Sequence, residues 1–332
     1  MRLNYNVLCI DDEIDSLADT KKSLIAHNEA VGISTNFVDQ PVVRTARETN
    51  VEKFKERIFA EIDEKFESLT FDLILVDLHI GENFKGGEVV GPIRNQTIYR
   101  PIIFFSGGQP AGEETAIEQL NDSIAKNNLA GKSVFLSTRG AKLNDDLRKI
   151  CSEMHEEEHK INAGRGLLMD RTSEVDAKVL SHIRNEAAWS KLTAEQSNVA
   201  FKKIAKILRS KGARARVNSC ILAKLGNGNF ESFKSWLIGS DDKEIYLKLD
   251  SFTRNQILRE LLRVQPDFSA RGDTHSRYFK LHEGTPSISQ IRNEYAHQTA
   301  AAIEPSHDRN RCKHIRNELR THVENVNAIS SL

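Results

Sequence analysis

The chain has 332 residues, 39% of them hydrophobic and 28% charged, which suits a globular protein with room for two domains. It contains no run of about 18 apolar residues, which excludes a membrane-spanning helix. The opening residues MRLNYN lack the apolar region of a secretory signal, so we expect none. We therefore expect a cytoplasmic protein without membrane contact. Its four cysteines are scattered without metal spacing, so we expect them to be reduced thiols. They are Cys9, Cys151, Cys220 and Cys312.

The balanced charge, 47 basic against 47 acidic residues, hides an asymmetry between the two halves. Residues 1–150 carry 18 basic and 24 acidic residues, whereas residues 151–332 carry 29 and 23. This pattern suits an acid-lined site in the first half and an anion-binding part in the second. A chance imbalance is the alternative.

In the first half, short apolar runs alternate with helical patterns, as in repeated βαβ units. We expect helices at 51–69 and 113–127. The strands are expected at 6–10, 33–38, 73–77, 101–105 and 133–136. The run Leu73–Val76 is apolar without interruption, which indicates a strand buried on both faces. The sequence therefore predicts an α/β fold with a doubly wound, five-stranded parallel sheet.

Polar side chains follow three of these strands directly. Asp11 and Asp12 end the first strand, Asp77 ends the third and Ser106 ends the fourth. The carboxyl ends of parallel strands meet at one edge of a sheet, where such folds place their chemistry. Clustered carboxylates repel one another, and a hard cation such as Mg²⁺ would relieve this. Asp77 could then act as a nucleophile towards phosphorus. The alternative is that Asp77 only caps the next turn.

The three segments LCIDDE, LILVDLHI and PIIFFSG, in this order, resemble the signature segments of response-regulator receiver domains. The resemblance covers residues 4–150. It implies that Asp77 accepts a phosphoryl group from a histidine kinase or phosphorelay protein. It also implies that Asp11 and Asp12 bind Mg²⁺, with Asp77 and the backbone carbonyl of His79 as further ligands. Ser106 would contact the phosphoryl group and move on activation.

The fifth strand departs from the family pattern. Receiver domains carry a lysine at its end, with an aromatic switch residue three positions earlier. Phe135 fits the aromatic position, but this register places Thr138 where lysine is expected. Arg139 or Lys142 could supply the cation after a local rearrangement, although arginine is not equivalent to lysine. The alternative is a receiver fold whose switching is independent of phosphate.

The spacing of apolar residues at 143, 147, 150 and 154 predicts a last receiver helix, followed by a linker near 161–166. We therefore predict a receiver domain at 1–160 and an effector domain at 161–332. His155 and His159 stand one helical turn apart, but no third metal ligand is in view, so we expect an exposed face there.

The second half shows helical patterns almost throughout and predicts an all-α bundle. Thr193 and Gln196 form a capping box that begins a helix near residue 194. Residues 266–286 contain glycine, serine and proline and predict a long loop. Two helices are expected after it, at 287–303 and 307–330.

A basic run near the start of this half contains no acidic residue and could neutralise nucleic-acid phosphates. A solvated helix face is the alternative. Its members are Lys202, Lys203, Lys206, Arg209, Lys211, Arg214 and Arg216.

The sequence IRNEYAH contains Arg292, Asn293 and His297. Arginine can stabilise a developing phosphorane, and histidine can act as acid or base near neutral pH, which suffices for metal-free RNA cleavage. The segment also resembles the Arg-x(4–6)-His motif of HEPN domains, helical bundles that often dimerise, many of which are ribonucleases. The resemblance implies a homodimer with Arg292, Asn293 and His297 in a catalytic cleft. A surface salt bridge and a packed helix are the alternative.

From these patterns we expect a response regulator of two-component signal transduction. Phosphorylation at Asp77 would control a helical effector, a metal-independent ribonuclease that uses Arg292 and His297. The alternative is a non-catalytic regulator whose basic helical domain binds nucleic acid or a protein partner.

Overall fold

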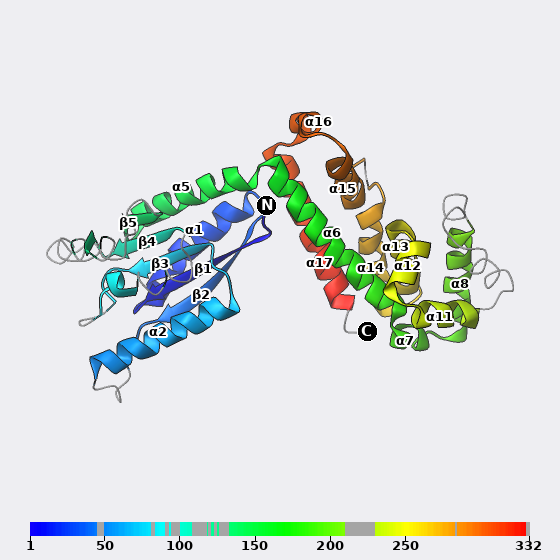
Figure 1. Ribbon diagram of the computed structural model, residues 1–332, viewed down its shortest axis with the longest axis horizontal. Coiled ribbons are helices and arrows are strands. Elements are labelled where there is room, and N and C mark those ends of the chain that lie inside the picture. Colours follow the sequence, from blue (N-terminus) through cyan, green and yellow to red (C-terminus); the bar gives the residue numbers. More distant parts are fainter. Residues whose placement is uncertain are drawn as a thin grey trace. The chain divides into compact units, whose positions relative to one another are not determined.

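The computed structural model describes residues 1–44, 50–80, 84–89, 100–107, 133–209, 230–282 and 284–329, together with residues 93, 118, 121, 122 and 125. The chain divides into two compact units: the first is Arg2–His159, and the second is Lys160–Leu332 together with Met1. Figure 1 shows a sheet with flanking helices in the first unit, and the parts of the second unit that the structure describes are mainly helical. Of the predicted helix at 113–127, most residues lie outside the described parts.

The first unit is built on a single parallel sheet of five strands in the order β2-β1-β3-β4-β5. The strands are β1 (Asn4–Asp11), β2 (Ser34–Pro41), β3 (Leu73–Asp77), β4 (Ile102–Ser106) and β5 (Val134–Thr138). The predicted doubly wound fold is confirmed. The chain order reverses between β1 and β3, and in open α/β sheets ligands bind at the carboxyl ends of strands beside such a reversal.

Helices cover both faces of the sheet. α1 (Ala18–Glu29) and α5 (Ala141–Glu158) lie on one face, and α2 (Val51–Ser68) lies on the other (Figure 1). Alternation along β3 explains the layers, because successive strand residues point to opposite faces. Leu73 and Leu75 join the apolar core under α1 and α5, whereas Ile74 and Val76 join the core under α2. All five β3 residues are buried, as the uninterrupted apolar run predicts.

α2 buries one stripe of side chains spaced four residues apart, Phe54, Ile58 and Ile62, as an amphipathic helix should. The side chain of Asn50 caps its first turn by accepting the N–H groups of Glu52 and Lys53. Two short 3₁₀ helices, η1 (Ile14–Leu17) and η2 (Gly86–Val89), follow β1 and β3 at the carboxyl edge of the sheet.

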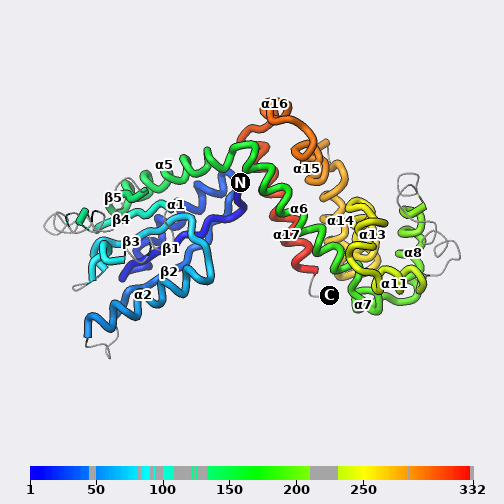
Figure 2. Tube along the Cα trace, viewed as in Figure 1, coloured from blue at the N-terminus to red at the C-terminus, as the bar shows by residue number. Residues whose placement is uncertain are grey.

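The second unit is helical. Its long helices α6 (Ile161–Arg184) and α17 (Arg309–Ile329) pack side by side (Figure 2), and α6 also contacts α11, α13 and α15. Within the described residues, the other helices of this unit are α7 (Glu186–Ser190), α8 (Ala194–Leu208), α11 (Phe230–Gly239), α12 (Asp242–Lys248), α13 (Ser251–Arg263), η3 (Pro266–Phe268), α14 (Ser269–Phe279), α15 (Ile288–His297), α16 (Ala300–Ile303) and η4 (Glu304–Ser306). The capping box of Thr193 and Gln196 begins α8 as predicted.

Three expectations about this half were wrong. The predicted linker at 161–166 is the helical start of α6. The predicted loop at 266–286 contains α14, a polar helix in which Gly272 allows the backbone of α13 to come close. The single helix predicted at 287–303 ends at His297, because Gln298 is extended and Thr299 caps a new helix, α16.

Among the described residues, no helix has both the length and the apolar character needed to cross a membrane. Cys9, Cys151 and Cys312 are buried and carry free thiols, and Cys220 lies outside the described residues.

Candidate functional site

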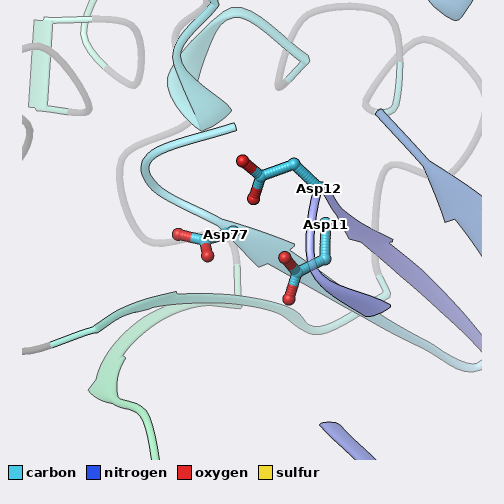
Figure 3. A group of neighbouring side chains, drawn as sticks. All are labelled: Asp11, Asp12 and Asp77. Atoms are coloured by element: carbon cyan, nitrogen blue, oxygen red, sulfur yellow. The ribbon is translucent and has the colours of Figure 1, made fainter. Parts of the chain in front are cut away.

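Three carboxylates meet at the carboxyl edge of the sheet. Asp11 ends β1, Asp12 follows it and Asp77 ends β3, and their ligating oxygens lie within 4.8 Å of one another (Figure 3). Asp11 is fully buried and Asp77 is 5% exposed. The neighbouring strands β1 and β3 thus bring together the acids that the sequence placed at one edge.

Backbone hydrogen bonds orient two of these carboxylates. The N–H of Glu13 donates to Asp11 Oδ1 at 2.8 Å, and the N–H of His79 donates to Asp77 Oδ1 at 2.9 Å. The Oδ2 atoms of Asp11 and Asp77 remain for other partners. His79 therefore touches the site through its N–H, and the ligand role of its carbonyl stays a prediction.

The cation of the site is Arg139. Its Nη2 lies 2.9 Å from Asp11 Oδ2 and 2.5 Å from Asp77 Oδ2, so one guanidinium bridges the two buried carboxylates. The same side chain lies over the ring of Phe105, 5.1 Å from its centroid, and hydrogen-bonds the hydroxyl of Ser16. The arginine next to the expected lysine position thus reaches the acids directly, without a rearrangement of β5.

Burial dominates the electrostatics of the acids. Desolvation raises the pKa of Asp11 to about 6, opposed by the N–H of Glu13 and by Arg139. Desolvation likewise raises the pKa of Asp77, opposed by the N–H of His79 and by Arg139. The single positive charge of Arg139 therefore does not balance the negative charge of the three carboxylates. A set of crowded carboxylate oxygens at this edge fits a hard divalent cation such as Mg²⁺.

The segment after β3 folds back closely onto the site. The N–H of Gly86 donates to the carbonyl of Leu78 at 3.1 Å, and a Cβ at position 86 would collide with the main-chain oxygen of Asp77. Only glycine fits here, so Gly86 holds η2 against the end of β3.

The predicted switch residues lie along β4 and β5. Ser106 is buried at the end of β4 and pairs in register with Thr138. The N–H of Arg139 donates to the carbonyl of Ser106 at 2.8 Å, and this hydrogen bond fixes the backbone of Arg139 beside the acids. Phe135 is half-buried against the core under α5, and Lys142 is exposed.

The residues proposed for catalysis in the helical unit lie on α15. Arg292 is half-buried, whereas Asn293 and His297 are exposed. Five residues of α-helix correspond to a rotation of about 140° between Arg292 and His297, so they do not share one helix face. Their joint role in RNA cleavage stays a prediction.

The described members of the basic run lie on α8 and at its end. Lys202, Lys203, Lys206 and Arg209 are exposed, and Lys203 Nζ lies 3.6 Å from a carboxylate oxygen of Glu260. Lys211, Arg214 and Arg216 lie outside the described residues. The nucleic-acid role of this run also stays a prediction.

Sequence reasoning missed three participants in the acidic site, namely Ser16, Gly86 and Phe105. Ser16 and Phe105 touch Arg139, and Gly86 packs on the backbone of Asp77. The adjacent pair Gly86-Gly87, soon after the strand acid, was an available signal for a close backbone approach. No sequence pattern marked Ser16.

No protein-family model and no curated protein matches the chain. Among solved structures, it is similar to a response regulator protein from Burkholderia pseudomallei with a phosphorylated aspartic acid, calcium ion and citrate, at 19% identity and a TM-score of 0.28, over 46% of this chain and 72% of that one. It is also similar to a fusion containing the yeast Spc42 trimeric coiled coil, at 12% identity and a TM-score of 0.28, over 52% of this chain and 96% of that one. Similarities at these TM-scores carry no information about what this chain does.

Proposed function

We propose that the first unit is a receiver-type signalling domain that accepts a phosphoryl group on Asp77. The observation that carries this proposal is the convergence of three carboxylates, from Asp11, Asp12 and Asp77, within 4.8 Å at the switch point of the sheet. Two of these acids, Asp11 and Asp77, are buried and only partly compensated, which costs stability, and such sites are candidates for function.

Asp77 Oδ2 is the nucleophile in this proposal, because the backbone N–H of His79 holds Oδ1, whereas the partner of Oδ2 is the side chain of Arg139, which can move away from it. Oδ2 forms a bond to phosphorus while the bond from phosphorus to the donor breaks, and the leaving group departs with its electron pair. Mg²⁺, held by Asp11, Asp12 and Asp77, would neutralise the carboxylates and draw charge from the phosphoryl oxygens.

Arg139 takes the role that a lysine has in receiver domains. In the unmodified site its Nη2 bonds Asp77 Oδ2. Once that oxygen carries the phosphoryl group, the guanidinium can donate to the phosphoryl oxygens instead, with up to two parallel hydrogen bonds. The hydroxyl of Ser106, at the end of the adjacent strand, is the proposed second donor. Because the carbonyl of Ser106 also accepts the N–H of Arg139, a movement of one of these residues would shift the other.

The proposed phosphoryl donor is a histidine kinase or phosphorelay protein, and the proposed output is the helical unit. The simpler proposal is that the helical unit binds a partner and catalyses no reaction, because Arg292 and His297 lie on different sides of α15. Ribonuclease activity, RNA as partner and pairing into a homodimer remain predictions from the HEPN resemblance.

Incubation of the full chain with acetyl phosphate and Mg²⁺ tests the proposal. We expect intact-mass spectrometry to show one added phosphoryl group on the parent, and none when the metal is chelated. A parent that stays unlabelled in Mg²⁺ under conditions that label an established receiver protein would sink the proposal.

A further inference from the structure

Two adjoining cavities open in the helical unit beside the C-terminal end of α14. The larger has a volume of about 420 Å³ and the smaller about 120 Å³. Arg277, Lys280 and His282 line both, so the cavities share one wall. A volume of this size falls in the range that holds small organic ligands.

The shared wall carries two cations without acidic partners. Among the described residues, neither Arg277 nor Lys280 has a carboxylate within ion-pair distance. Burial, followed by the neighbouring charges of Arg259 and Arg263, lowers the pKa of Lys280. Glu260 opposes this shift. Among the described lining residues, the cations Arg263, Arg277 and Lys280 outnumber the acids Asp273 and Glu318, so the wall carries a positive balance.

The two acids that line the cavities are already engaged. Asp273 accepts from Arg263, which lies at the end of α13, at 2.5 Å. Glu318 lines the smaller cavity, and the hydrogen bond from His322, then the nearby charges of His314 and Arg277, lower its pKa. Neither of these two acids forms a salt bridge with Arg277 or Lys280.

Further donors face the smaller cavity. The imidazole ring of His314 lines this cavity. Pro286 and Ser287 bring the N-terminus of the ten-residue helix α15 to the same cavity, and the positive end of a helix dipole favours anions. The larger cavity adds the hydroxyl of Thr274 and the apolar side chain of Leu281, which is 59% exposed.

We propose that these joined cavities, between α13, α14, α15 and α17, form a binding site for a phosphate ester of nucleotide size. The phosphate would lie at the wall of Arg277 and Lys280, and the larger cavity, with Leu281 at its rim, would take the organic part. A free nucleotide and a nucleic-acid strand present the same phosphate chemistry, so both are tested. The site is separate from the basic run on α8, and it does not depend on phosphorylation of Asp77.

Isothermal titration calorimetry on the full chain, with adenosine monophosphate and with a short single-stranded RNA as separate probes, tests the site. The key variant is Arg277→Ala/Lys280→Ala. The matched control is Lys22→Ala/Lys243→Ala, which removes two cations from exposed helical positions. Each hydrogen bond from a cation is worth about tenfold in affinity, so the key variant should lose about a hundredfold, and the control should match the parent.

Loss of adenosine monophosphate binding in the key variant alone identifies a free nucleotide as the ligand. The same loss for RNA, with no binding of the mononucleotide, identifies a nucleic-acid strand. Equal affinities in key variant and control, or no binding of either probe to the parent, would overturn the proposal. Circular dichroism verifies folding, and if the double variant unfolds, Arg277→Gln alone should weaken binding while Lys280→Arg preserves it.

Discussion

Arg139 is predicted to compensate the buried acid cluster, so its replacement by glutamine should destabilise the first unit. Asp11 and Asp77 have side chains 0% and 7% exposed, and Arg139 itself is 21% exposed. Removing one partner of such a buried pair typically costs about 3–5 kcal/mol, because the remaining charges stay desolvated. For a unit of this size, about 3 kcal/mol corresponds to a fall of roughly 6–12 °C in Tm.

The assay is differential scanning calorimetry of parent and Arg139→Gln, in chelator and in Mg²⁺. In chelator the variant should show the full fall in Tm. In Mg²⁺ the difference should shrink, because the metal then compensates the carboxylates, and the variant should bind Mg²⁺ more tightly than the parent. Arg148→Gln is the control: Arg148 is 50% exposed and pairs with Asp145 on the surface of α5, so it should change stability by less than about 1 kcal/mol.

The reasoning would be refuted if Arg139→Gln and Arg148→Gln unfolded at the same temperature in chelator. It would also be refuted if Mg²⁺ stabilised the parent more than Arg139→Gln, since the parent already holds a cation between its carboxylates.

Three further predictions concern other parts of the chain. Gly86→Ala should lower both Tm and phosphoryl acceptance, because the added Cβ would collide with the backbone at the end of β3. The control is Gly166→Ala on α6, where a Cβ meets no other atom, and it should raise stability by about 0.5–1 kcal/mol. Burial lowers the pKa of His275 to about 3, so below about pH 6.5 this histidine binds a proton in the unfolded chain but not in the folded chain. The free energy of unfolding should therefore fall by about 1.4 kcal/mol for each pH unit below 6.5. Denaturant titrations at several pH values should show a smaller fall for His275→Phe. If the helical unit is a ribonuclease, Arg292→Ala and His297→Ala should each abolish cleavage of labelled RNA, and cleavage by both variants at the parent rate would contradict the HEPN resemblance.

The sheet was predictable because its signal is local. The uninterrupted apolar run Leu73–Val76 predicts the buried strand. The acids at the ends of β1 and β3 predict the edge of the sheet at which the carboxylates meet. Strand alternation then follows from the pleat, without knowledge of partners.

The cation of the site was harder to predict because it depends on how one strand ends. Thr138 is the last residue of β5 and pairs with Ser106, and Arg139 follows at the turn before Gly140, whose φ of +96° ends the strand. A register argument places the side chain of residue 138 at the acids, but the turn brings the long side chain of Arg139 there instead.

The helical unit was predicted as a class and missed in detail. α14 lacks a clear apolar stripe, and His275, Tyr278 and Phe279 are buried because α13, α15 and α17 pack against it. The break after His297 depends on Thr299, whose side chain caps α16 by accepting the N–H of Ala302. Such features arise from tertiary packing and from capping, which the hydrophobic period alone does not reveal.

The most direct test of the central claim is to map the modified residue after reaction with acetyl phosphate and Mg²⁺. Reduction of the acyl phosphate with borohydride followed by peptide mass spectrometry should place the label on Asp77, with none in Asp77→Asn. Label on Asp11 or Asp12, or undiminished label in Asp77→Asn, would contradict the account.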